Sequence, residues 1–177
     1  MKPTFPGLTI IYTGNGKGKT TAALGLALRA SARGKKVAMI QFVKSDRESG
    51  EQFLAKHVRL PFRIYSLGLG FVGILNDRRQ RHEHVRAARA ALRRAKGLVR
   101  RCDVLILDEI NGAIKGKLIR LADVISLIRT KPPAVTLVLT GRQASPRLVA
   151  LADLVTEMKE IKHPFQKGKF AQPGIDY

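Results

Sequence analysis

The sequence predicts an α/β fold built on a doubly wound, mostly parallel sheet. Segments typical of strands and helices alternate along the chain, and this order favours a parallel sheet with helices on both faces. The strand segments are continuous apolar runs, such as LTIIYT and VAMIQFV, as expected where a strand is buried on both faces. The chain has no internal repeat, linker or low-complexity tract, so we expect residues 1–177 to form one domain.

The elements of the N-terminal half are separated by glycines and polar stretches. Glycines end the first apolar run, and Gly34 follows an Ala- and Leu-rich segment in a position suited to a helix C-terminus. A polar stretch after the second apolar run favours a loop that holds a short helix. The predicted elements are a strand at 8–13, a helix at 19–33, a strand at 37–43, a short helix at 52–56 within the loop 44–61, and a strand at 63–67.

The C-terminal half begins with a long amphipathic helix, predicted over 77–101. Its apolar stripe recurs at helical spacing and consists of Val85, Ala88, Leu92, Ala95 and Val99. A basic face lies beside it, formed by Arg86, Arg89, Arg93, Lys96 and Arg100, and His82 and His84 are expected on its solvated surface. The remaining predicted elements are a strand at 104–107, a helix at 117–129, a strand at 136–140, a short helix from Ser145–Pro146 to Leu151, a strand at 154–161 and an irregular tail.

Composition restricts the classes of function. The net charge is +20, from 33 Lys and Arg against 13 Asp and Glu, which makes nucleic acid a partner to consider beside a merely basic, solvated surface. A single cysteine, Cys102, excludes an internal disulfide framework and a zinc-type cysteine cluster. No apolar stretch approaches the ~18 residues that would span a membrane, and the N-terminus lacks a signal-peptide pattern, so we expect a cytoplasmic protein.

The segment TGNGKGKTT, at 13–21, has the composition and position of a phosphate-binding loop. Glycines between a buried strand and a helix let backbone N–H groups turn toward an anion at the helix N-terminus. A strict motif would have glycine where Thr13 stands, so this loop is a variant, and the GKT triplet argues against an incidental glycine-rich turn. Lys19 would contact phosphate oxygens and Thr20 would bind Mg²⁺. The predicted nucleotide-binding residues of the loop are Gly14, Asn15, Gly16, Lys17, Gly18, Lys19, Thr20 and Thr21.

Two carboxylates, Asp108 and Glu109, follow the apolar run VLIL. The C-terminal edge of a parallel sheet is where ligands bind, and Mg²⁺ prefers oxygen ligands such as these. Adjacent residues of a strand point in opposite directions, so one of the two faces the metal, and periodicity does not separate them. Arg142 follows the next strand, where it would contact phosphate or form a structural salt bridge.

With these motifs the chain resembles the P-loop ATP:corrinoid adenosyltransferases, which act on cob(I)alamin or cob(I)yrinic acid a,c-diamide. The resemblance covers almost the whole sequence. Its segments are IIYTGNGKGKTTAALGLALRA, QFVK, LILDEINGAI, LVLTGRQASPRLVALADLVTEM and KHPFQKGKFAQPGIDY. The loop GNGKGKTT, together with TGR and the closing KH…GIDY, is more specific than a phosphate loop alone.

The resemblance implies a RecA-like fold, a homodimer, and ATP and Mg²⁺ as cofactors. It also implies a reduced corrinoid as substrate and an electron-donating reductase as partner. In that reaction Co(I) attacks the 5′ carbon of ATP and triphosphate leaves, with ATP lying reversed along the loop relative to ordinary NTPases. Lys19, the loop N–H groups and Mg²⁺ on Thr20 with Asp108 or Glu109 would neutralise the leaving group. Lys19, Glu109 and Phe71 are the residues that the resemblance places at the reaction.

The sequence also departs from the family pattern. Many members have Phe and, two residues later, Trp, whereas this chain has Phe71 and Gly73 and no tryptophan. The family's QF-x-K-G ends here in Ser45. Two other functions remain under consideration. One is a P-loop ATPase that binds nucleic acid, motivated by the charge, and the other is a carrier of corrinoid or nucleotide that does not react, suggested by the missing Trp.

Overall fold

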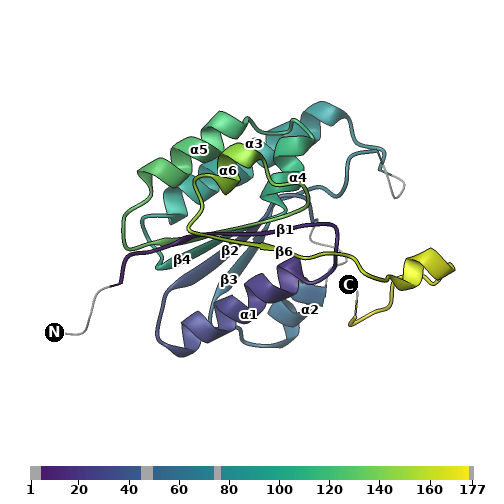
Figure 1. The fold of residues 1–177 in the computed structure, drawn as a ribbon, viewed down its shortest axis with the longest axis horizontal. Helices are drawn as coiled ribbons and strands as arrows, with labels where there is room; N and C mark the ends of the chain where they lie inside the picture. Colours follow the sequence, from purple (N-terminus) through teal and green to yellow (C-terminus); the bar gives the residue numbers. More distant parts are fainter. Residues whose placement is uncertain (1–4, 45–49, 74–76, 176–177) are drawn as a thin grey trace.

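The protein is a six-stranded parallel sheet covered by helices on both faces (Figure 1). The computed structural model describes residues 5–44, 50–73 and 77–175. Every strand pair is parallel and the strand order is β3-β2-β4-β5-β1-β6. This confirms the predicted fold class. The strands are β1 (Thr9–Thr13), β2 (Val37–Gln41), β3 (Arg63–Ser66), β4 (Val104–Asp108), β5 (Thr136–Thr140) and β6 (Leu154–Glu157).

Helices from different parts of the chain cover the two faces. Figure 1 shows α1 and α2 on one side of the sheet and α3, α4, α5 and α6 on the other. The helices are α1 (Lys19–Ala32), α2 (Gly50–His57), α3 (Arg81–Leu98), α4 (Ile110–Lys115), α5 (Leu121–Thr130) and α6 (Pro146–Val149), and a 3-10 turn, η1 (Pro164–Lys167), lies in the tail. None of the helices in the described ranges combines the length and the apolar character needed to cross a bilayer.

The core consists of two layers, because alternate residues of each central strand face opposite helices. Leu105 and Leu107 pack with α3, α4 and α5, whereas Val104 and Ile106 pack with α1. Helix α3 contributes small side chains to this core. Ala88, Ala91 and Ala95 are fully buried and let the helix lie close to the sheet. The predicted apolar stripe of this helix is therefore confirmed.

The parallel arrangement gathers the functional segments at one edge. Gln41 pairs with Asp108, and Tyr12 pairs with Thr140, so β1, β2, β4 and β5 end at nearly the same level. The segments that follow these four strands are therefore neighbours in space although they are far apart in the sequence.

Several predicted boundaries are wrong. The strand predicted at 154–161 ends at Glu157, because its only sheet neighbour among the described residues, β1, ends opposite it at Thr13. The helix predicted from residue 77 begins at Arg81, where Gln80 and Glu83 form a capping box. Other corrections are the end of this helix at Leu98 rather than 101, a strand that ends at Gln41 rather than 43, a helix that begins at Leu121 rather than 117, a helix that ends at Val149 rather than 151, and the unpredicted α4 and η1. Ser45 and the last two residues of the tail, 176–177, lie outside the described residues.

His84 is also a correction, because it is buried rather than solvated, with 2% of its surface exposed. Its Nε2 lies 2.8 Å from Oδ2 of Asp77, which also accepts a hydrogen bond from the backbone N–H of Gly73. The arginines around His84 in the sequence are exposed, whereas this one position faces the segment that leads into α3. His82 is exposed, as predicted.

Candidate active site

The phosphate loop joins β1 to α1 and rests on the segment after β6. The N–H of Gly16 donates to the carbonyl of Met158 at 2.7 Å. Gly14 has φ +94°, and a Cβ at this position would lie 2.4 Å from the same carbonyl oxygen. Gly18 precedes α1 with φ +110°, a left-handed conformation that L side chains rarely adopt. The glycines therefore let the loop turn tightly against β6.

We expect Gly14→Ala to destabilise the protein by ~1–3 kcal/mol, because it combines an unfavourable φ with a backbone clash. Gly25→Ala is the matched control. Gly25 lies inside α1, where an added Cβ meets nothing within 4 Å, so this change should leave stability equal or higher. Thermal or urea unfolding of both variants checks the prediction. Equal stability of Gly14→Ala and the parent protein would contradict it.

Lys19 lies beneath the loop, and only 8% of its surface is exposed. Its Nζ donates to the carbonyls of Gly14 at 2.9 Å and Gly16 at 2.6 Å. Burial lowers the pKa of the ammonium, the neighbouring Glu109 opposes this, and Arg142 adds to the lowering. The side chain therefore presents a desolvated positive charge at the loop, where an anion would interact with it strongly.

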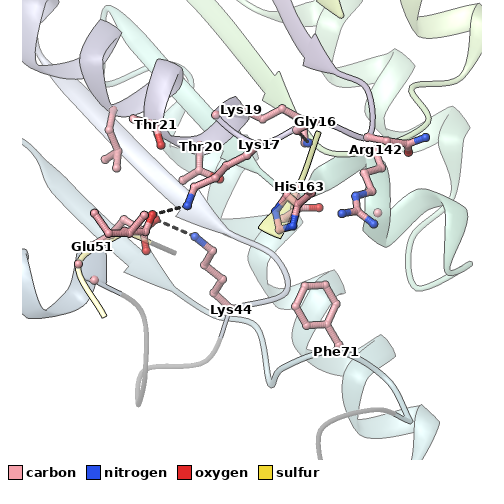
Figure 2. A pocket seen from close by; sticks show the side chains of 18 of the residues that line it. Gly16, Lys17, Lys19, Thr20, Thr21, Lys44, Glu51, Phe71, Arg142 and His163 are labelled. Carbon is pink, nitrogen blue, oxygen red and sulfur yellow. Dashed lines mark hydrogen bonds and ion pairs between the residues drawn. The ribbon is translucent and has the colours of Figure 1, made fainter. Parts of the chain in front are cut away.

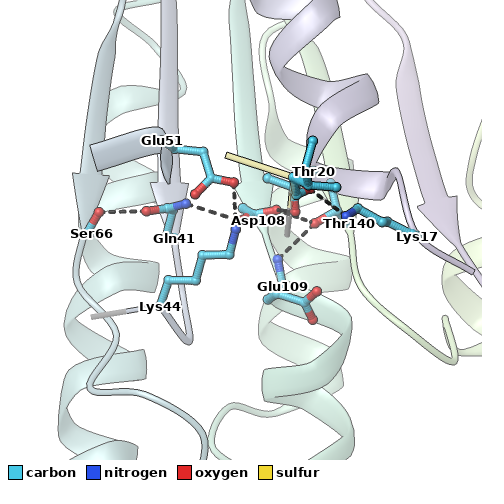
Figure 3. Close-up of polar contacts among 10 residues, drawn as sticks. Lys17, Thr20, Gln41, Lys44, Glu51, Ser66, Asp108, Glu109 and Thr140 are labelled. Carbon is cyan, nitrogen blue, oxygen red and sulfur yellow. Dashed lines mark hydrogen bonds and ion pairs between the residues drawn. The ribbon is translucent and has the colours of Figure 1, made fainter. Parts of the chain in front are cut away.

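Asp108 is the centre of a buried polar cluster (Figure 3). Its Oδ1 accepts hydrogen bonds from the hydroxyls of Thr20 at 2.8 Å and Thr140 at 2.7 Å. Its Oδ2 accepts from Nε2 of Gln41 at 3.3 Å and lies 4.0 Å from Nζ of Lys44. Of the two adjacent carboxylates, Asp108 is thus the one beside the first turn of α1.

Glu109 takes a different direction because its backbone is left-handed, with φ 59°. Its N–H donates to the hydroxyl of Thr140 at 2.9 Å, and its carboxylate lies against Gly112 and Gly141, where a Cβ would come within 3.1 and 3.2 Å of Oε2. Burial raises the pKa of this carboxyl, Asp108 adds to the rise, and Lys19 opposes it. Glu109 is therefore a partly desolvated acid that lines the cavity.

The raised pKa of Glu109 predicts that Glu109→Gln increases the stability of the fold, by an amount that depends on pH. A carboxyl whose folded pKa lies above its unfolded value of about 4.5 stabilises the fold at low pH, and this contribution is lost as pH rises through the folded pKa. We therefore expect the variant to unfold at a higher temperature than the parent at pH 8. The difference should shrink as the pH approaches 4.5, as measured by thermal unfolding across that range. A variant with unchanged stability at pH 8 would contradict the prediction.

A cavity of about 890 Å³ extends from the phosphate loop, a volume typical of ligand-binding sites. Most of the predicted site residues line it: residues 15–21, Phe71, Glu109 and Arg142. Gly14 and Asp108 are not among its lining residues. They accept hydrogen bonds from two residues that do line it, Lys19 and Thr20 respectively. Five basic side chains line the cavity against two carboxylates, so its electrostatic character favours an anion.

The sequence did not identify several lining residues, including Lys44, Glu51 and Ile175, and only the resemblance of the tail pointed to His163. Figure 2 shows Lys44, Phe71, Arg142 and His163 around the same cavity. Lys44 Nζ pairs with Glu51 Oε1 at 2.7 Å, which joins the loop after β2 to α2. The tail approaches the phosphate loop, where Lys17 Nζ donates to the carbonyl of Ile175 at 2.5 Å. The signals in the sequence that could have found some of these residues are the basic side chains and the KH…GID tail. No periodic pattern connected either of them to the phosphate loop.

The fold and the site together define a P-loop nucleotide-binding protein of the RecA-like type. A similar fold is found in the flagellar accessory protein FlaH of Methanocaldococcus jannaschii, with a TM-score of 0.54 at 13% identity over 85% of this chain and 70% of that one.

The chain belongs to the family described as ATP:corrinoid adenosyltransferase BtuR/CobO/CobP, which it matches over residues 6–177. A corrinoid adenosyltransferase of a Sinorhizobium species is 41% identical over 97% of this chain and 80% of its own length. One from Escherichia coli K12 is 35% identical over 97% of this chain and 86% of its own length.

Proposed function

We propose that this enzyme transfers the 5′-deoxyadenosyl group of ATP to Co(I) of a corrinoid in cobalamin synthesis or salvage. The observation that supports this most directly is the cavity itself, which joins a phosphate loop of the family to the exposed ring of Phe71. The Co–C5′ bond forms as the bond from C5′ to the triphosphate oxygen breaks, and the bonding pair leaves with triphosphate.

In this proposal the loop holds the triphosphate while the ribose carbon stays open to attack, so ATP lies reversed relative to ordinary NTPases. Lys19 and Arg142 neutralise the negative charge that leaves with triphosphate. Lys19 suits this task because its ammonium is buried at the loop carbonyls and needs little reorganisation. Phe71, which is 47% exposed, offers the corrin an apolar contact, with Leu24 and Leu54 also lining the cavity.

Mg²⁺ fits the residues beside the loop. Thr20 and Asp108 place a hydroxyl and a carboxylate oxygen 2.8 Å apart, and both are ligand types that Mg²⁺ prefers. Across the described ranges, no group of three or more His, Cys, Asp or Glu is suited to hold a metal ion. This agrees with an ion that takes its other ligands from phosphate and water. When bound, Mg²⁺ would neutralise charge on the triphosphate, with Glu109 as a further carboxylate nearby.

The proposal also includes a homodimer and an electron-donating reductase in the cytoplasm. β6 lies at the edge of the sheet with Leu154 and Val155 each about 40% exposed, an apolar surface that a second copy would cover. The reductase is required because the nucleophile is Co(I). Light scattering of the purified protein tests the dimer, and a monomer at micromolar concentration would contradict it.

The experiment for the reaction combines the protein with ATP, Mg²⁺ and chemically reduced cobalamin, cobinamide or an a,c-diamide corrinoid. We expect the visible spectrum of an adenosyl–cobalt species together with inorganic triphosphate, and the corrinoid that reacts fastest identifies the preferred substrate. Formation of only ADP and phosphate would refute the proposal in favour of an ATPase. Tight binding of both ligands without any product would instead identify a carrier.

A further inference from the structure

A continuous basic stripe runs along α3, away from the active-site cavity. Its residues are Arg86, Arg89, Arg93, Lys96 and Arg100, and all five are exposed. Their spacing alternates between three and four residues, which keeps the four that lie in α3 on one side of the helix. From Arg86 to Lys96 the row spans about 15 Å at 1.5 Å per residue, and Arg100 follows in the turn after the helix.

The middle of this stripe borders a hollow between α3 and the start of α5. The hollow has a volume of about 420 Å³ and is lined by Arg89, Leu92, Arg93, Lys96, Ile119, Arg120 and Asp123. The one acidic residue in it, Asp123, is already bound by Arg120, with Nε and a terminal nitrogen each 2.9 Å from a carboxylate oxygen. Arg120, and then Lys96 and Arg89, hold the pKa of Asp123 below its usual range. The hollow therefore keeps a surplus of positive charge.

The charges of the stripe are not used to hold the fold together. Among the described residues, none of the five forms a hydrogen bond or an ion pair with a carboxylate. Other arginines of the same helix differ from them. Arg81 donates to the carbonyl of Gly116 at 2.6 Å, and Arg94 lies 4.5 Å over the ring of Tyr65. A row of unpaired charges repels itself, so its presence points to an external anion.

We propose that this α3–α5 basic face binds the phosphodiester backbone of a nucleic acid. The row presents several cations in line, as a polyanion with regularly spaced phosphates requires, and the hollow accommodates a phosphate between Arg89, Arg93 and Arg120. An acidic protein fits less well, because protein interfaces have an apolar core and no large hydrophobic residue of α3 or α5 is exposed. The face shares no lining residue with the phosphate-loop cavity, so it is a separate site.

The test compares two variants of equal charge. Arg89, Arg93, Lys96 and Arg100 are replaced by Gln in the first, and Arg29, Arg33, Lys35 and Lys36 in the second. Each change removes four positive charges, from +20 to +16, and the second set is exposed at the end of α1 and in the turn before β2, on the opposite side of the sheet. Binding of a fluorescein-labelled 20-nucleotide RNA and of a 20-base-pair DNA is followed by anisotropy at several salt concentrations, with ATP and Mg²⁺ saturating the phosphate loop.

We expect the parent protein to bind in near-physiological salt, with an affinity that falls steeply as salt increases. The α3 variant should lose at least about tenfold in affinity, and its slope of log K against log salt should decrease by about 3–4. The α1 variant should retain most of the affinity and most of the salt dependence of the parent protein. Adenosyl transfer, measured in parallel, should be unchanged in both variants, because neither set lines the active-site cavity.

Four results would overturn the proposal. The first is no binding by the parent protein, and the second is an equal loss in both variants, which would indicate general charge. The third is binding that appears only when ATP and Mg²⁺ are left out, which would place the nucleic acid in the phosphate loop. The fourth is equally tight binding of poly-glutamate through the same four residues, which would identify the face as an interface for an acidic protein.

Discussion

Lys19→Ala is expected to lower kcat/KM for adenosyl transfer by on the order of 10²–10³-fold, with a parallel loss of ATP affinity. The substitution removes the one buried cation of the phosphate loop, whose ammonium is held at 2.9 and 2.6 Å by the carbonyls of Gly14 and Gly16. No solvent-exposed lysine replaces it, because a screened charge interacts far more weakly with phosphate than a desolvated one. Calorimetric titration with ATP and a spectroscopic assay of adenosyl–cobalt formation measure the two effects.

Lys35→Ala is the matched control for this change. Lys35 is exposed in the turn before β2, at the end of the sheet away from the cavity, so its removal changes the net charge equally without touching the loop. Its ATP affinity should equal that of the parent. Thermal unfolding separates loss of the binding charge from loss of the fold, since Lys19 also bridges two loop carbonyls. A folded Lys19→Ala protein with unchanged ATP affinity would refute the assignment of the loop.

The strands and their order of appearance were predictable because they are buried on both faces. A continuous apolar run such as VLIL is typical of a strand buried on both faces, and all four of its residues are buried in β4. The ends of the elements were less predictable, since they depend on partners elsewhere in the chain. β6 stops at Glu157 where β1 stops, and no local feature of the sequence encodes that limit.

The loop residues of the site were predictable from local chemistry, whereas the walls of the cavity were not. Residues 15–21, which line the cavity, were predicted because glycine, lysine and threonine in that order are typical of a phosphate-binding loop. Asp108 and Glu109 could not be separated by strand alternation, because Glu109 leaves the strand in a left-handed conformation and is the N-cap residue of α4. Lys44 and His163 reach the cavity from irregular segments, so neither periodicity nor spacing placed them there.

The second large effect is expected from Asp108→Asn, which replaces one carboxylate oxygen by an amide nitrogen at a residue with no exposed surface. Oδ1 accepts from two hydroxyls, of Thr20 and Thr140, and Oδ2 accepts from the Gln41 amide. An Asn nitrogen in the position of Oδ2 would point a donor at the Gln41 amide, and in the position of Oδ1 it would force both hydroxyls to turn and accept. In either orientation the negative charge beside Thr20 would be lost. We expect a loss of stability of about 1.5–3 kcal/mol, typical of hydrogen bonds to a charged group.

The same variant should also lose most of its activation by Mg²⁺, because the proposed metal position keeps the Thr20 hydroxyl but lacks its carboxylate. Asp153→Asn controls for stability alone, since the Asp153 carboxylate accepts from the N–H of Thr9 at 2.7 Å, at the opposite end of β1 from the loop. Both variants should unfold at lower temperature, but only Asp108→Asn should require a higher Mg²⁺ concentration for half-maximal adenosyl transfer. If the two variants keep the same Mg²⁺ dependence, then Asp108 only supports the fold, and Glu109 becomes the carboxylate that meets the metal.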